Sequence, residues 1–116
     1  MNPLSDEQLV ALLNDIESDR AERKRDWSGN APEKARQAVC AFANDLPNYG
    51  EPGIVFIGAN DDGSTANIQV TDQLLQTLSD MKTDGKIIPP PTLTVEKRIL
   101  KGASMGLVTV WPAGAL

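Results

Sequence analysis

The most informative segment for the fold of this chain is Gly53-Ile54-Val55-Phe56-Ile57-Gly58-Ala59-Asn60-Asp61-Asp62-Gly63. Its apolar first half is short and bounded by glycines, which predicts a central β-strand that is buried on both faces. Asp61-Asp62-Gly63-Ser64 then gives a strong turn signal, because Asp and Gly favour tight turns. We therefore expect a buried strand that leads directly into a turn.

Two helices and one charged strand are expected before this stretch. Ser5-Asp6-Glu7-Gln8 is a capping box that opens the first helix. Pro32 suits the first turn of the second helix, and Pro47, Gly50, Pro52 and Gly53 then break the chain into a loop. The segment from Arg20 to Asp26 is too charged for a core element, which favours an exposed or edge strand. The expected apolar positions are Leu9, Val10, Leu12, Leu13 and Ile16 in the first helix, and Ala35, Ala38, Val39, Phe42 and Leu46 in the second.

One more helix and three strands are expected after the turn. Ala66 to Val70 predicts a short strand, and Thr71 is a good N-cap for a helix with apolar positions at Leu74, Leu75, Leu78 and Met81. Gly85 is a natural helix stop, and Pro89-Pro90-Pro91 predicts an extended connector. Two strands then close the chain, Thr92–Leu100 and Gly106–Trp111, joined by a turn at Lys101-Gly102. The order α-β-α-β-β-α-β-β predicts an α/β (α+β) fold in which helices pack on a mixed sheet.

Length and composition indicate a single globular domain over residues 1–116. The one cysteine, Cys40, excludes an intrachain disulfide and is expected to be a buried apolar residue. There is no signal peptide and no apolar run near the length of a membrane span, so we expect a cytoplasmic protein. The absence of histidine removes Ser-His-Asp and Cys-His catalysis in their common forms.

Charge is distributed unevenly along the chain, whose net charge is −5. Residues 1–62 hold 12 acids and 6 bases, whereas residues 63–116 hold 4 acids and 5 bases. Because Lys and Arg drive contact with phosphate, such a chain is not an ordinary non-specific nucleic-acid binder. Seven Lys and Arg residues could still form a phosphate-binding stripe, or they could serve only for solubility and for protection of the sheet edges. These residues are Arg20, Arg23, Lys24, Arg25, Lys97, Arg98 and Lys101.

Carboxylates supply the other candidate chemistry. Glu17 and Glu22 straddle the end of the first helix, and a bend there would bring both to one point for a hard cation such as Mg²⁺. The alternative is a solvated face with Glu22 in a salt bridge to a neighbouring Arg. Asp61 and Asp62 follow the central strand, where functional side chains are common, but turn chemistry explains them equally. No glycine-rich loop ending in Gly-Lys-Ser/Thr is present, so no motif supports ATP binding.

Three motifs in order resemble those of Schlafen-type AlbA-like domains across residues 10–112. Glu17-Ser18 with Glu22-Arg23-Lys24 resembles the Glu-Ser…Glu-Phe-Lys signature, and Ala41-Phe42-Ala43-Asn44 resembles Ala-Phe-Ala-Asn. The stretch from Val55 to Gly63 resembles the strand and Asp-rich turn of the family. Within the family, the chain resembles bacterial proteins described as ATP-binding or transcription-regulator-like, sometimes as divergent AAA-type.

The resemblance implies an AlbA-like α/β fold and a link to nucleic acid. In animal members, two glutamates and an aspartate form a metal-dependent RNase site. Carried over by motif, these residues are Glu17, Glu22 and either Asp61 or Asp62, with Mg²⁺ or Mn²⁺ as the metal. Three departures from the family pattern bear on this transfer. Arg23 replaces the usual aromatic residue, and Asp45-Leu46-Pro47-Asn48-Tyr49-Gly50 replaces the Gly-Gly that usually follows the Asn. The family also usually continues past the position of Leu116, so an N-terminal fragment of a longer protein is expected.

Three functions follow as hypotheses. The first is a nucleic-acid-associated regulatory or defence domain, acting on RNA or DNA, with a three-carboxylate nuclease site. The second is an unconventional ATP-binding domain of a transcription-regulator-like protein. The third is a non-catalytic module that forms a homodimer and presents a missing C-terminal region.

Overall fold

The computed structural model describes residues 3–45, 49–83 and 92–112 of the chain. Within these ranges, four strands form one sheet in the order β1-β2-β4-β3. The strands are β1 (Ala21–Lys24), β2 (Gly53–Ile57), β3 (Thr92–Leu100) and β4 (Ala103–Trp111). β1 runs parallel to β2, whereas β4 runs antiparallel to both β2 and β3. The expectation of a mixed sheet is therefore confirmed.

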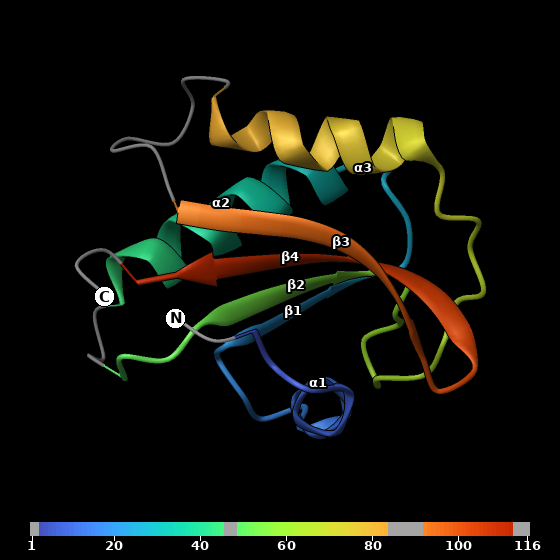
Figure 1. The fold of residues 1–116 in the computed structure, drawn as a ribbon, viewed down its shortest axis with the longest axis horizontal. Helices are drawn as coiled ribbons and strands as arrows, with labels where there is room; N and C mark the ends of the chain where they lie inside the picture. The colour runs from blue at the N-terminus through green and yellow to red at the C-terminus, as the bar shows by residue number, and fades with distance from the viewer. Residues whose placement is uncertain (1–2, 46–48, 84–91, 113–116) are drawn as a thin grey trace.

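Helices cover both faces of this sheet (Figure 1). α1 (Asp6–Asn14) packs on one face, and α2 (Ala31–Asn44) and α3 (Asp72–Ser79) pack on the other. Every residue of β2 is buried, as the sequence predicts. Ile54 and Phe56 join the core under α1, whereas Val55 and Ile57 join the core under α2 and α3. This split follows from the strand geometry, since successive side chains point to opposite faces.

The predicted helix starts are confirmed by their caps. The Ser5 hydroxyl accepts from the Gln8 backbone N–H at 3.2 Å, and the Gln8 side chain accepts from the Ser5 N–H at 2.9 Å. Thr71 Oγ1 accepts from the Leu74 N–H at 3.1 Å and caps α3. In the parts of the chain that the structure describes, no helix has the length and apolar character needed to cross a bilayer.

Two details of the predicted helices differ from the structure. α1 ends at Asn14, so Ile16 is not part of its apolar side and is 62% exposed. α3 ends at Ser79 and continues as a short 3₁₀ helix, Asp80–Lys82, which contains the buried Met81. Leu46, Gly85 and the three prolines at 89–91 lie outside the described residues.

The prediction of a short strand at Ala66 to Val70 is wrong. Only an isolated bridge, between Ala59 and Thr65, forms in this part of the chain. Asn67 has a φ of 55°, a left-handed conformation that an extended strand does not tolerate. The observed order is therefore α-β-α-β-α-β-β, with the 3₁₀ helix after α3.

The closing hairpin is confirmed, although β4 begins at Ala103 rather than at Gly106. Lys101 and Gly102 form its turn, with φ values of 55° and 78°. Positive φ at both central positions is the pattern whose twist matches that of the flanking strands. Cys40 packs against the core under α2 and α3 but is half-buried rather than fully buried as expected, and Trp27 is half-buried against the same core.

Candidate functional site

The strand register aligns two lysines across the whole sheet. Lys24 pairs with Ile57, Ile57 pairs with Gly106, and Gly106 pairs with Lys97. Because Ile57 faces α2 and α3, and paired residues of neighbouring strands share a face, both lysines lie on that face. We call this set the Lys24–Lys97 row. Three strand spacings separate its ends, which is about 14 Å.

The row lies at the end of the sheet where β1 and β2 terminate and where the β3–β4 turn lies (Figure 1). We call this the carboxyl end of the sheet. Lys97 and Arg25 are exposed here and make no hydrogen bond or ion pair with any other described residue. Lys24 Nζ forms an ion pair with Glu22 Oε1 at 3.1 Å. Five residues of the predicted basic stripe thus lie at this end, namely Lys24, Arg25, Lys97, Arg98 and Lys101, although Arg98 points to the opposite face from Lys97.

Lys101 ties the hairpin turn to two other segments. Its Nζ donates to Asn14 Oδ1 at 2.8 Å and to the Gly63 carbonyl oxygen at 2.9 Å. The end of α1, the turn after β2 and the hairpin tip therefore meet at one point. Gly63 is required there, because a Cβ at this position would lie 2.7 Å from the Leu13 carbonyl oxygen.

Arg23 has a structural role instead of the predicted phosphate contact. The side chain is only 8% exposed, on the face that α1 covers. Its Nε donates to the Leu13 carbonyl at 2.9 Å, and its Nη2 donates to Leu12 and Asp15 carbonyls at 3.1 and 2.9 Å. The Leu12 and Asp15 carbonyls also accept backbone N–H groups, from Asp15 and Ser18, whereas Arg23 supplies the donor for the Leu13 carbonyl at the C-terminus of α1.

The other two arginines of the stripe also have protein partners. Arg98 forms ion pairs with Asp6 and Glu96, and its pKa is raised mainly by the hydrogen bond to Asp6. Arg20 Nε donates to the Pro52 carbonyl oxygen at 3.2 Å, at the opposite end of β1 from Lys24. The seven predicted cations are therefore not one continuous stripe.

The four predicted carboxylates lie in three places. Glu17 is exposed in the connection before β1, and Glu22 is half-buried on β1, where Lys24 rather than an Arg is its partner. Asp61 and Asp62 are exposed in the turn after β2. Asp62 Oδ1 accepts from the backbone N–H and the hydroxyl of Ser64, and this hydroxyl bond in particular lowers the pKa of Asp62.

This arrangement does not present a preformed metal site. Among residues 3–45, 49–83 and 92–112, no three His, Cys, Asp or Glu side chains are grouped so that they could hold a metal ion. Mg²⁺ and Mn²⁺ require oxygen ligands that converge on one point. We therefore derive no chemical step through a metal, and the three-carboxylate site stays a prediction.

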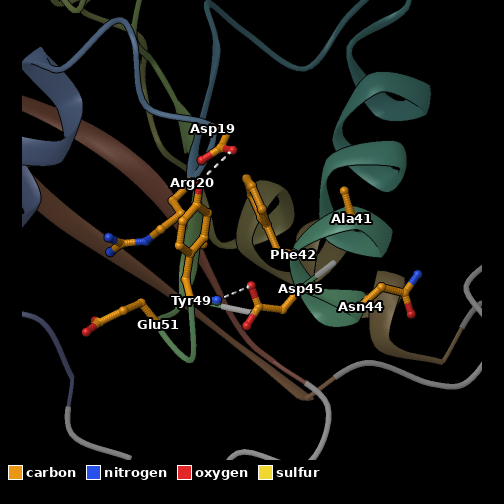
Figure 2. A pocket seen from close by; sticks show the side chains of 9 residues that line it. Asp19, Arg20, Ala41, Phe42, Asn44, Asp45, Tyr49 and Glu51 are labelled. Carbon is orange, nitrogen blue, oxygen red and sulfur yellow. Dashed lines mark hydrogen bonds between the residues drawn. The ribbon is translucent and has the colours of Figure 1, made fainter. Parts of the chain in front are cut away.

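A cavity that sequence reasoning missed lies at the other end of the sheet, where β1 and β2 begin (Figure 2). It has a volume of about 330 Å³. Figure 2 shows Tyr49 reaching with its hydroxyl toward Asp19, while its backbone lies against Asp45. The lining residues are Asp19, Arg20, Ala41, Phe42, Asn44, Asp45, Tyr49, Glu51 and Gly53. They come from three separate segments, so no spacing in the sequence groups them.

The sequence profile of the Schlafen, AlbA_2 domain matches residues 17–114. The chain belongs to this family. Membership indicates a nucleic-acid-related function, and the matched range includes all three motifs that carry the resemblance. The range also contains the Lys24–Lys97 row and the residues that line the cavity, so both belong to the family domain itself.

A solved structure supports the same fold. The N-terminal domain of a putative ATP-dependent DNA helicase RecG-related protein from Nitrosomonas europaea, determined in solution by NMR, is similar with a TM-score of 0.55. The two chains are 24% identical, and the match covers 94% of this chain and 72% of that one. No match was found among curated proteins.

Proposed function

We propose that this chain is a nucleic-acid-associated regulatory or defence domain that contacts RNA or single-stranded DNA through the carboxyl end of its sheet. The observation that carries the proposal is the Lys24–Lys97 row, which places the half-buried Lys24 and the exposed Lys97 on one face of the sheet, at its two edges. Membership of a nucleic-acid-related family supports the same choice of ligand.

The row suits a phosphate backbone for a physical reason. Its two ammonium groups extend from opposite edge strands, so a strand of nucleic acid that crosses the sheet end meets both. Lys97 has no partner among the described residues, and the Lys24–Glu22 pair is partly solvated. Exchanging such a pair for a phosphate contact costs little, because surface ion pairs contribute only about 0–1 kcal/mol.

The neighbouring carboxylates set the expected strength of binding. Asp61 and Asp62 lie at the same end, and the chain as a whole carries a net charge of −5. Phosphate contacts must therefore be placed between acidic side chains, so we expect weak and strongly salt-dependent binding. Such a surface favours a defined path for the nucleic acid over indiscriminate attachment.

Cleavage is a separate step that this proposal does not require. The nuclease hypothesis assigns it to Glu17, Glu22 and either Asp61 or Asp62, with Mg²⁺ or Mn²⁺. The ATP hypothesis has a parallel in the similar solved structure, whose name refers to a putative ATP-dependent DNA helicase. Neither a phosphate loop nor a carboxylate cluster supports these two hypotheses among the described residues, so binding is the better-supported activity.

The test is fluorescence anisotropy with labelled single-stranded RNA and DNA at low salt, on wild type and on Lys24→Gln/Lys97→Gln. Removing two phosphate contacts should weaken binding by about tenfold at low salt. Lys82→Gln is the matched control, because Lys82 is an exposed lysine outside the row. Equal loss in both variants, or no binding by wild type, would contradict the proposal.

A further inference from the structure

The cavity at the amino end of the sheet combines an apolar wall with a charged rim. Ala41, Phe42 and Gly53 form the wall. Gly53 lets the chain approach the Phe42 ring, since a Cβ on Gly53 would lie 2.2 Å from that ring. The volume of about 330 Å³ is at the small end of the range for ligand sites. It suits a single side chain or a small group rather than a folded surface.

Charge decides what kind of group the cavity favours. Its lining includes the carboxylates of Asp19, Asp45 and Glu51, and only one cation, Arg20. At neutral pH these four side chains leave a net charge of −2. A phosphate group would be repelled by this rim, whereas a cation would be attracted.

Two of the three carboxylates, Asp19 and Asp45, are held in position before any ligand arrives. Asp45 Oδ1 accepts from the Tyr49 N–H at 3.0 Å, and Asp45 Oδ2 accepts from the Gly50 N–H at 2.8 Å. Asp19 Oδ2 accepts from the Tyr49 hydroxyl at 3.0 Å. Each carboxylate oxygen keeps a further lone pair for a donor. Glu51 is exposed and has no partner among the described residues, so both of its oxygens are available.

The aromatic residues add a second attraction for cations. Tyr49 and Phe42 both line the cavity, and the faces of aromatic rings attract ammonium and guanidinium groups. The Tyr49 hydroxyl donates to a carboxylate, which makes its ring richer in electrons and a better partner for a cation. A guanidinium is favoured over an ammonium, because its planar set of five donors matches carboxylates and also stacks on rings.

The rim continues into a second hollow. Arg20 and Glu51 line both cavities, and the second one, of about 300 Å³, also contains Asp15, Gln8 and Leu12. The Arg20 guanidinium is held to the Pro52 carbonyl at the boundary between them. A peptide whose side chain entered the first cavity would therefore pass a further carboxylate at Asp15. Four carboxylates and one arginine thus line the two adjoining hollows, which together we call the groove.

We infer that this groove binds a basic peptide segment of a partner protein, with an arginine side chain in the Asp19–Asp45–Glu51 cavity. The inference is independent of the proposed nucleic-acid contact, which uses the opposite end of the sheet. A nucleotide is the competing occupant, since Phe42 and Tyr49 would also stack on a base. The rim disfavours it, because a phosphate would enter the field of three carboxylates.

The experiment is an NMR titration of the ¹⁵N-labelled chain with acetyl-Gly-Arg-Gly-amide. The citrulline version of this peptide, which is neutral and nearly the same shape, is one comparison, and adenosine monophosphate is another. The inference expects the arginine peptide to shift the amide signals of Tyr49, Gly50 and Glu51, and the citrulline peptide to leave them in place. Glu51→Gln should lower the affinity for the arginine peptide by about threefold.

Glu33→Gln is the matched control, because Glu33 is an exposed carboxylate on α2 outside both cavities. It should leave peptide binding unchanged. Equal shifts with citrulline would overturn the inference, as would an equal effect of the two glutamate variants. Shifts with adenosine monophosphate alone would assign the cavity to nucleotides, and no shift with either peptide would reject a peptide site. None of these outcomes bears on the Lys24–Lys97 row, which the anisotropy assay tests separately.

Discussion

The guanidinium of Arg23, on β1, donates to the carbonyl oxygen of Leu13, near the end of α1, at a distance of 2.9 Å. This contact joins an edge strand to the helix that covers one face of the sheet. Two more bonds from the same side chain, to Leu12 and Asp15 carbonyls, complete the link. A charged side chain in an edge strand therefore serves as a helix cap.

Replacing Arg23 should destabilise the fold. Arg23→Met keeps much of the apolar stem but removes all three bonds and leaves the Leu13 carbonyl at the end of α1 without its donor. We expect a loss of about 2–4 kcal/mol in the free energy of unfolding, measured by urea denaturation. Arg25→Met is the control, because Arg25 is exposed, and it should change stability by less than about 0.5 kcal/mol. Equal effects of the two changes would reject the capping role.

Two glycines with positive φ should respond differently to alanine. Gly63 has a φ of 85°, and its Cβ would lie 2.7 Å from the backbone oxygen of Leu13. Gly29 has a φ of 58° with nothing within 4 Å. Thermal or urea unfolding should show a cost of about 1 kcal/mol for Gly29→Ala, from backbone strain alone. Gly63→Ala should cost clearly more, because strain and a backbone clash add, and the reverse order would contradict the structure.

Salt dependence gives a quantitative check on the Lys24–Lys97 row. For single-stranded nucleic acid, each phosphate contact contributes about 0.7 to the slope of log K against log salt. Lys24→Gln and Lys97→Gln should each lower the magnitude of this slope by about that amount, and the double variant by about twice as much. Anisotropy titrations across a series of salt concentrations supply the slopes. Slopes that stay unchanged would show that these lysines do not contact phosphate.

The three-carboxylate hypothesis is open to a direct measurement. Because Glu17, Glu22 and the Asp61–Asp62 turn do not form a metal-holding group here, we expect no tight Mn²⁺ binding by calorimetry on this chain. Glu17→Ala/Glu22→Ala is the comparison variant. Mn²⁺ binding by wild type that disappears in this variant would reverse our expectation and support a nuclease site. RNA and single-stranded DNA cleavage assays would then follow.

Tyr49 offers a clean spectroscopic probe, because it is the single tyrosine in the chain. The hydrogen bond to Asp19, and then the negative charge of Asp19, raise the pKa of Tyr49 above its ordinary value of 10.0. The Tyr49–Asp19 hydrogen bond therefore stabilises the folded state fully below pH 10.0. This stabilisation is lost as pH rises through the higher pKa that Tyr49 has in the folded state. Ultraviolet absorbance should show the Tyr49 titration moving to lower pH in Asp19→Asn. An unchanged midpoint would mean that the two side chains are not coupled.

Local sequence signals predicted those elements whose cause is local. The buried strand at Gly53–Ile57 follows from an apolar run between glycines, and the starts of α1 and α3 follow from Ser5 and Thr71 as caps. The turn at Lys101-Gly102 follows from the need for positive φ. At Ala66 to Val70, by contrast, strand-like composition was overridden by the left-handed Asn67, and no β-ladder forms there.

The candidate sites also differ in how far local sequence signals predicted them. Family motifs in the sequence located Glu17, Glu22 and the Asp61–Asp62 turn, but not their separation in space. Composition alone grouped Arg23 with the exposed cations, whereas its burial depends on where α1 ends. Similarly, no pattern linked Asp19, Phe42 and Tyr49, which line one cavity from three segments.

By itself, the sequence specifies the helix caps, the buried central strand, the tight turns and the family of this chain, since each depends on neighbouring residues or on short motifs. Tertiary structure decides which charges meet. The pairing of β1 with β2, β2 with β4 and β4 with β3 aligns Lys24 with Lys97, although 72 residues separate them in the chain. Packing of α1 against β1 removes Arg23 from solvent, and the junction of α2 with β1 and β2 gathers the carboxylates of the cavity. These outcomes depend on strand register and on helix placement. Both are determined by side-chain contacts between residues that are far apart in the sequence.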